Sequence, residues 1–200
     1  MKNIALYGGT FDPIHLGHIA VAISLIEQKG LDHVFFIPAK NNPFKQKAPH
    51  ASAEHRYAMV ETALKGVPHC SALPLEIHRT GPSFTIDTVQ QLRSEKLQRE
   101  DALFFIIGED QLRHFHEWKE VEELVLLAQP LVVKRPGSHL EGEWKKNPLL
   151  ARVIEKGTCT TPLFDISATQ IRDRLKKKLF CGHLLHPSVL QYIEQHALYE

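Results

Sequence analysis

The sequence has few cysteines and no excess of charge of either sign. Its 200 residues include three cysteines, 24 lysines and arginines, and 23 aspartates and glutamates. Three widely spaced cysteines form neither a disulfide framework nor a CxxC metal site, so we expect a reducing compartment. A net charge of +1 lacks the basic excess that bulk binding to nucleic acid requires, so we expect no nucleic-acid partner.

Long hydrophobic runs are missing as well. No apolar stretch approaches the roughly 20 residues that span a bilayer, so we expect no membrane partner. The chain starts with MKNI and enters an apolar run at once, which predicts no signal peptide and a cytoplasmic location. The length predicts one domain over residues 1–200, with a helical end at about residues 167–200. The sequence leaves open whether the chain forms a homo-oligomer.

Apolar strands and helices alternate along the chain. Strands are expected at residues 3–9, 33–39, 69–79 (irregular), 102–108, 130–137 and 161–166, and helices at 17–30, 52–66, 83–96, 112–128 (broken near Trp118), 143–157, 168–179 and 187–198. The continuous apolar run ALFFIIG at 102–108 indicates a strand that is covered on both faces. The alternation predicts an α/β fold with a doubly wound parallel sheet, whose ligands lie at the carboxyl ends of the strands.

The first strand-to-helix turn reads GGTFDPIHLGH, residues 8–18. Its two glycines let the backbone approach a ligand closely, and the helix that follows offers unpaired N–H groups and a positive dipole end. His15 and His18 add imidazole donors, so the turn predicts a phosphate site. Two alternatives remain: a purely structural turn, and a metal site, for which no third ligand stands at HExxH-like spacing.

A second turn with the same character reads DISATQIRDRL, residues 165–175. Ser167 and Thr169 place hydroxyl groups at a helix start, and the guanidinium of Arg172 can grip phosphate oxygens. The alternative is an ordinary serine N-cap on a solvated basic helix. We expect both turns to meet at one edge of the sheet, with His15, His18 and Arg172 facing a single phosphate cradle.

Five segments of the chain resemble a known family. GGTFDPIHLGH resembles the N-terminal motif of the HxGH nucleotidyltransferase superfamily, and ISATQIR resembles its ISSTxxR motif, with Ala168 in place of the second serine. RTGPSFTIDTV (79–89), IIGEDQLRHFHEW (106–118) and VKRPG (133–137) resemble segments of the bacterial nicotinate-nucleotide adenylyltransferases. The resemblance implies a Rossmann-like fold and, with Mg²⁺ and ATP, adenylyl transfer to nicotinate mononucleotide, which gives deamido-NAD and pyrophosphate in NAD biosynthesis.

The resemblance also implies residue roles. It implies four catalytic residues, His15, His18, Lys45 and Arg172, and further ATP-binding residues, Gly8, Gly9, Thr10, Phe11, Ser167 and Thr169. It implies that Thr85, Asp110, Trp118 and Arg135 bind the acceptor. Because Mg²⁺ often bridges substrate oxygens with few direct protein ligands, we predict no metal-binding side chain. The loop PAKNNPFK (38–45) has Phe44 where the family often has histidine, and Lys45 fits the family lysine better than Lys47. By spacing alone, Trp118 could equally be a core residue and Asp110 a helix cap.

Two other functions stay open. An adenylyltransferase could use another acceptor, either nicotinamide mononucleotide or phosphopantetheine, although RTGPSFTIDT and Trp118 fit the phosphopantetheine enzymes less well. A non-catalytic nucleotide sensor could use the same fold, and it would bind ATP without releasing pyrophosphate.

Overall fold

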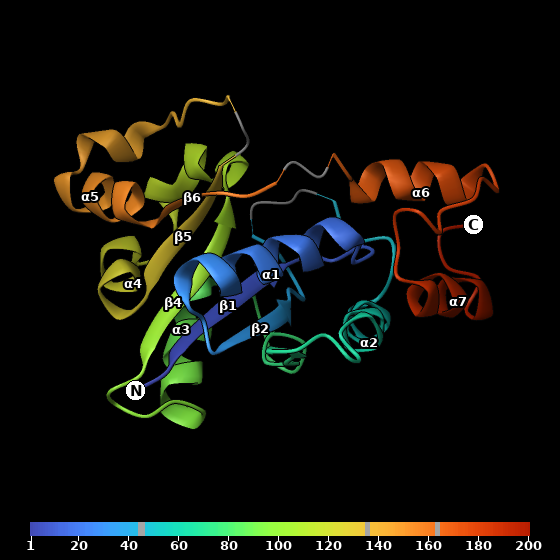
Figure 1. The fold of residues 1–200 in the computed structure, drawn as a ribbon, viewed down its shortest axis with the longest axis horizontal. Helices are drawn as coiled ribbons and strands as arrows, with labels where there is room; N and C mark the ends of the chain where they lie inside the picture. Colours follow the sequence, from blue (N-terminus) through green and yellow to red (C-terminus); the bar gives the residue numbers. More distant parts are fainter. Residues whose placement is uncertain (44–46, 135–136, 163–164) are drawn as a thin grey trace.

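A parallel sheet forms the centre of the molecule (Figure 1). The structure is a computed structural model, and it describes residues 1–43, 47–134, 137–162 and 165–200. Within these ranges the sheet has six strands in the order β3-β2-β1-β4-β5-β6, and every neighbouring pair is parallel. The strands are β1 (Asn3–Gly9), β2 (His33–Pro38), β3 (Cys70–Ala72), β4 (Ala102–Gly108), β5 (Gln129–Lys134) and β6 (Thr158–Thr160).

Helices connect the strands and extend the chain beyond the last one. They are α1 (Leu16–Lys29), α2 (Ala53–Ala63), α3 (Thr85–Glu95), the 3₁₀ helix η1 (Glu109–Glu117), α4 (Val121–Leu127), the 3₁₀ helix η2 (Glu143–Lys146), α5 (Pro148–Gly157), α6 (Ala168–Lys176) and α7 (Pro187–Gln195). Helices α2, α6 and α7 lie together at the end of the molecule that carries the C label in Figure 1. In the described ranges, every helix is too short or too polar to cross a membrane.

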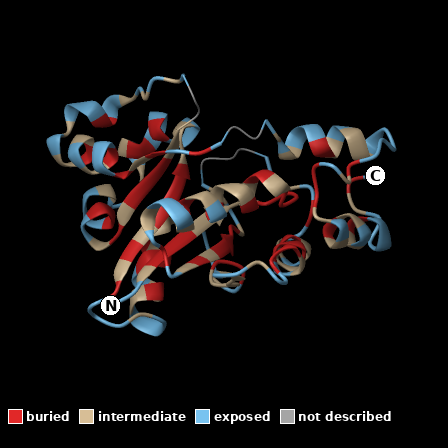
Figure 2. Cartoon of the chain, in the orientation of Figure 1, coloured by how far each residue is buried: buried red, intermediate tan, exposed pale blue. Residues whose placement is uncertain are grey.

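The sheet separates two hydrophobic cores because successive strand residues point to opposite faces. Ala5 packs into one core with residues of α1, α2, α6 and α7. Its neighbours Ile4 and Leu6 pack into the other core with residues of α3, α4 and α5. Buried residues accordingly run along the strands in Figure 2. The predicted doubly wound α/β fold is confirmed.

One predicted strand is wrong. The sequence predicts a strand at 161–166, but the edge strand is Thr158–Thr160, and residues 163–164 lie outside the described ranges. Two local features explain the shift. A side chain at Gly157 would collide with the backbone of Pro130, so the glycine lets α5 end directly against β5. Pro162 then lacks the N–H that would extend the ladder.

Other predicted elements exist with different bounds. The irregular strand expected at 69–79 is short, Cys70–Ala72, because Pro74 follows soon after it. The helix expected at 112–128 is divided at Trp118, as predicted, where the backbone is extended with φ −67° and ψ 142°. The strand expected at 130–137 is described as Gln129–Lys134, and residues 135–136 lie outside the described ranges.

The strand order creates a crevice at the carboxyl edge between β1 and β4. From β1 the chain continues to β2 on one side, and from β4 it continues to β5 on the opposite side. The two connections therefore run in opposite directions from neighbouring strands. In sheets of this type such a switch point is where ligands bind. The GGTFDPIHLGH turn follows β1 and the GED segment follows β4, so both predicted site segments reach this crevice.

Candidate active site

A cavity of about 810 Å³ opens at the switch point. Most of the predicted site residues line it: Gly8, Gly9, Thr10, Phe11, His15, His18, Thr85, Asp110, Trp118, Ser167, Thr169 and Arg172. Lys45 and Arg135 lie outside the described residues, whereas Lys47 lines the cavity. The two turns that the sequence analysis singled out therefore meet in one place, although their residues are about 150 positions apart in the chain.

The glycines at the end of β1 leave space along the cavity wall. A Cβ built at Gly8 would meet no atom within 4 Å, so packing of the described residues does not require a glycine there. A Cβ at Gly9 would lie 2.8 Å from Cζ of Phe11, whose buried ring covers this glycine. The missing side chain at Gly8 therefore keeps room in which a ligand can approach the strand backbone.

His15 and His18 form a stacked pair at the start of α1. Their ring centroids are 3.7 Å apart with an angle of 26° between the planes. The backbone N–H of His15 donates to Nδ1 of His18 at 3.2 Å. Because Nδ1 accepts this hydrogen bond, the neutral His18 ring carries its proton on Nε2, where it is a donor.

His15 is buried and electrically neutral in the free site. The residue is 8% exposed, and within the described part of the chain its Nδ1 atom has no hydrogen-bond partner. Burial lowers the pKa of His15 from 6.5 to about 4. An unpartnered polar atom in a buried site is costly unless a ligand compensates for it. A nearby phosphate would raise this pKa because it favours the charged imidazolium.

The start of α6 carries further residues that line the cavity. Ser167 is the N-cap residue, yet among the described residues no helix N–H donates to its hydroxyl group, unlike an ordinary serine cap. Nη2 of Arg172 donates to Oγ1 of Thr169 at 3.0 Å, and Nη1 donates to the carbonyl oxygen of Asp12 at 2.6 Å. These two contacts fix the guanidinium at the cavity, close to the turn that carries His15.

Residues suited to an acceptor line the same cavity. Thr85 is the first residue of α3, so its hydroxyl lies beside the unpaired N–H groups of that helix. Trp118 packs edge-to-face on Phe115 with ring centroids 5.1 Å apart, so it is at once part of the core and part of the cavity wall. Asp110 lies in the first turn of η1 and folds back over Gly108, where a side chain would collide with it.

Glu76 is a cavity residue that the sequence analysis missed. Its side chain is buried and accepts a hydrogen bond from Oγ1 of Thr88 at 2.7 Å. Burial raises the pKa of Glu76, which favours its neutral form.

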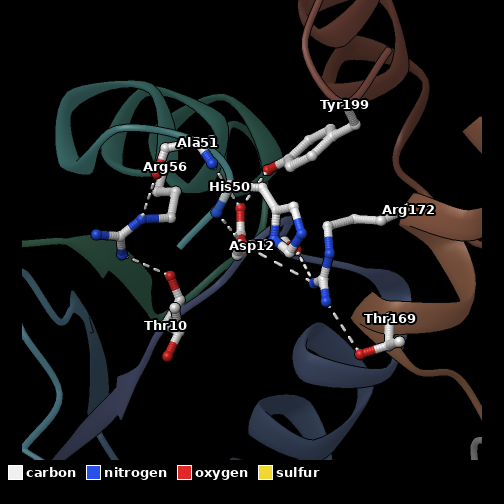
Figure 3. Close-up of polar contacts among 8 residues, drawn as sticks. All are labelled: Thr10, Asp12, His50, Ala51, Arg56, Thr169, Arg172 and Tyr199. Atoms are coloured by element: carbon white, nitrogen blue, oxygen red, sulfur yellow. Dashed lines mark hydrogen bonds and ion pairs between the residues drawn. The ribbon is translucent and has the colours of Figure 1, made fainter. Parts of the chain in front are cut away.

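Asp12 is a buried polar residue of the site that was not predicted from the sequence. Its carboxylate accepts hydrogen bonds from the backbone N–H groups of His50 and Ala51 and from the hydroxyl of Tyr199 (Figure 3). Burial raises its pKa, but these hydrogen bonds outweigh burial and hold the pKa of Asp12 below its usual value. Its place inside the GGTFDPIHLGH turn was a signal in the sequence that pointed to it.

Arg56 is a buried cation that joins two loops of the site. Only 1% of the residue is exposed. Its Nη1 atom donates to the carbonyl oxygens of Thr10 and Ala39, each at 2.7 Å, and Nε donates to that of Ala51 at 3.2 Å. It lies on the buried face of α2 together with Met59 and Val60. An arginine three and four positions before these apolar residues was the signal in the sequence, because residues at that spacing share one face of a helix.

Comparisons with known proteins agree with this geometry. A family model described as cytidylyltransferase-like matches residues 6–174. Nicotinate-nucleotide adenylyltransferase of Bacillus subtilis (strain 168) is 38% identical over 200 residues, which cover 100% of both chains. A structure of Plasmodium falciparum nicotinic acid mononucleotide adenylyltransferase complexed with NaAD matches with a TM-score of 0.76 at 21% identity, covering 100% of this chain and 98% of that chain. The same enzyme complexed with APC gives a TM-score of 0.72 at 21% identity, with the same coverage.

Proposed function

The chain belongs to the cytidylyltransferase-like family, and on that premise we propose that it transfers the adenylyl group of ATP to nicotinate mononucleotide. The products are deamido-NAD and pyrophosphate. The observation that carries the proposal is the convergence of His15, His18 and Arg172 on one cavity, which Thr85 and Trp118 also line. Side chains that can bind phosphate lie beside an aromatic ring. This arrangement suits two nucleotides whose phosphates react with each other.

The reaction needs little acid–base chemistry. A phosphate oxygen of nicotinate mononucleotide attacks the α-phosphorus of ATP, and the bond from that phosphorus to the oxygen bridging to the β-phosphate breaks. The acceptor phosphate is already an anion at neutral pH, so no general base has to remove a proton. The barrier arises from bringing two polyanions together and from the charge that develops on the leaving pyrophosphate, so positioning and electrostatics supply most of the acceleration.

The residues at the cavity meet these demands. In this proposal Nε2–H of His18 donates to a phosphate oxygen, and the guanidinium of Arg172 holds charge on the leaving group. His15, neutral in the free site, becomes a stronger donor when the triphosphate raises its pKa. Gly9 and Thr10 line the same wall, and we propose that their backbone N–H groups donate to phosphate oxygens.

The ATP substrate is MgATP in this proposal. Mg²⁺ keeps several waters and is commonly bound through substrate phosphates, where it offsets their charge. In the described ranges, no group of three or more His, Cys, Asp or Glu side chains is placed to hold a metal ion. We propose that the ion enters the site with the triphosphate.

The acceptor binds against Trp118 and Thr85 in this proposal. The indole offers an aromatic face for the nicotinate ring, and the start of α3 offers a hydroxyl and unpaired N–H groups to its carboxylate. The dipole of α3 favours this negative charge at its N-terminus. A carboxamide lacks the charge, so these contacts favour nicotinate mononucleotide over nicotinamide mononucleotide.

A pyrophosphate-release assay tests the proposal. The protein is incubated with MgATP and, in separate reactions, with nicotinate mononucleotide, nicotinamide mononucleotide or phosphopantetheine. We expect pyrophosphate and a dinucleotide in equal amounts, with the highest kcat/KM for nicotinate mononucleotide. His18→Ala is the matched catalytic variant, and we expect it to lose about a hundredfold or more in kcat/KM, as when one preorganised donor is removed.

Three outcomes would contradict the proposal. ATP binding without pyrophosphate release from any acceptor would indicate a nucleotide sensor. A higher kcat/KM with another acceptor would make the assignment of nicotinate mononucleotide wrong. A loss of less than about tenfold in folded His18→Ala would exclude the catalytic role of that histidine.

A further inference from the structure

Asp12 links three parts of the chain at the edge of the phosphate site (Figure 3). Oδ2 accepts the N–H of His50 at 2.8 Å, and Oδ1 accepts the N–H of Ala51 at 3.1 Å. The hydroxyl of Tyr199 donates to Oδ1 at 2.8 Å, across 187 positions of sequence. The carbonyl oxygen of Asp12 accepts Nη1 of Arg172 at 2.6 Å, and that Nη1 lies 3.9 Å from Oδ2.

Tyr199 makes this contact from a buried position that follows α7. The residue is 8% exposed, and its ring belongs to the core on the face of the sheet covered by α1. Its hydroxyl is thus carried inward to a carboxylate, away from solvent. Burial, together with the neighbouring Asp12, raises the pKa of Tyr199 well above its usual value, so the hydroxyl stays protonated and remains a donor.

Arg172 depends on Asp12 for its orientation. Two of its N–H groups are occupied by the carbonyl oxygen of Asp12 and the hydroxyl of Thr169. The same guanidinium lines the cavity, and its side chain is 15% exposed. A displacement of Asp12 would therefore move a cation that meets the phosphates, and a small misplacement of a binding group is costly in a site that works by positioning.

We propose that Tyr199 is a positioning residue for triphosphate binding, which holds Asp12 and, through it, the guanidinium of Arg172. The inference rests on the proposed function because it assumes that Arg172 meets ATP. Tyr199 does not touch the substrate in this proposal: it is absent from the cavity wall, which Asp12 and Arg172 both line. Its effect should therefore appear in ATP affinity rather than in acceptor affinity.

Tyr199→Phe tests the inference because it removes the hydroxyl and keeps the ring. Calorimetric titration with MgATP should show a dissociation constant raised by about threefold to tenfold, part of the effect of losing a hydrogen bond to a charged group. The KM for nicotinate mononucleotide should change by less than about twofold, since Thr85 and Trp118 are untouched. If Tyr199 acts through Arg172, Tyr199→Phe should add almost nothing to the ATP defect of Arg172→Gln.

Tyr192→Phe is the matched control. Tyr192 lies in α7, and its hydroxyl is 3.0 Å from Nδ1 of His55 in α2, so this variant also loses one hydroxyl contact near the end of the chain. We expect it to leave the dissociation constant of MgATP unchanged. A purely structural role for Tyr199 would instead lower the unfolding temperature of Tyr199→Phe and leave its affinity for MgATP unchanged.

The outcomes separate this inference from the proposed function. Wild-type protein that binds MgATP and releases pyrophosphate, combined with unchanged ATP affinity in Tyr199→Phe, would overturn the positioning role alone. Equal weakening by Tyr192→Phe, or full additivity with Arg172→Gln, would overturn it as well. Wild-type protein that binds no MgATP would overturn both the proposed function and the inference.

Discussion

Lowering the pH should destabilise this protein through His15. Burial holds the pKa of this imidazole at about 4 in the folded protein, compared with 6.5 for an exposed histidine. Between these values the unfolded chain binds a proton that the folded chain does not, so stability is lost as the pH falls from about 6.5 to about 4. Above pH 6.5 both states are neutral at this position, and His15 gives no pH dependence there.

The two pKa values set the size of the effect. At pH 5.5 the unfolded imidazole is mostly protonated and the folded one is not, which lowers the free energy of unfolding by about 1.4 kcal/mol. Below pH 4 the loss reaches a limit of about 3.4 kcal/mol, the full difference between the two pKa values. The loss at pH 5.5 is a large fraction of the stability of an ordinary domain.

Urea unfolding at pH 7.5 and pH 5.5 measures this loss. Wild type, His15→Gln and the control His78→Gln, whose histidine is exposed, are compared at both pH values. Glutamine does not titrate, so His15→Gln should lose about 1.4 kcal/mol less than wild type between the two pH values. His78→Gln should behave as wild type. An equal loss in wild type and His15→Gln would refute the reasoning, because it would mean that His15 titrates alike in both states.

Three further predictions concern other residues of the site. Gly8→Ala should not lower the unfolding midpoint, because a Cβ there meets no atom within 4 Å, but it should weaken MgATP binding roughly tenfold in calorimetric titration, since the methyl group fills space at the carboxyl end of the strand. Trp118→Ala should raise the KM for nicotinate mononucleotide roughly fivefold to a hundredfold, the range for one lost stacking contact, and should change the KM for ATP little. Arg56→Met should lower the free energy of unfolding in urea by about 3 kcal/mol or more, since it leaves three carbonyl oxygens without their donor.

Structural features that depend on residues close together in the sequence could be predicted. The run ALFFIIG is apolar at every position before its glycine, which indicates a strand with a helix layer on each face, and β4 has that surrounding. The GGTFDPIHLGH turn carries its glycines and histidines within eleven residues, so its place after the first strand could be predicted. The expected meeting of the first turn with the Arg172 turn is correct, but the second turn does not follow a strand directly, and the contact runs from Arg172 to the carbonyl oxygen of Asp12.

Contacts between residues that are far apart in the sequence could not be predicted. Tyr199 has no pattern around it that points to Asp12, and the contact exists because α7 carries the chain back toward the first turn. The edge strand was misplaced for a related reason. Apolar residues at 161–166 read as a strand, but the end of α5 against β5 fixes where the chain joins the sheet, and that end depends on the missing side chain of Gly157.

The negative charge of Asp12 has to be reconciled with the proposed phosphate site. A carboxylate beside bound phosphates would repel them, and at first sight it weakens the site. Here its charge is directed at the donors of His50, Ala51 and Tyr199, and the neighbouring Arg172 lies 3.9 Å from the same carboxylate. The field that Asp12 projects into the cavity is thereby reduced, while the arginine gains a fixed orientation. Because the proposed reaction accelerates by positioning charge rather than by moving protons, fixing one cation offsets the cost of one buried anion.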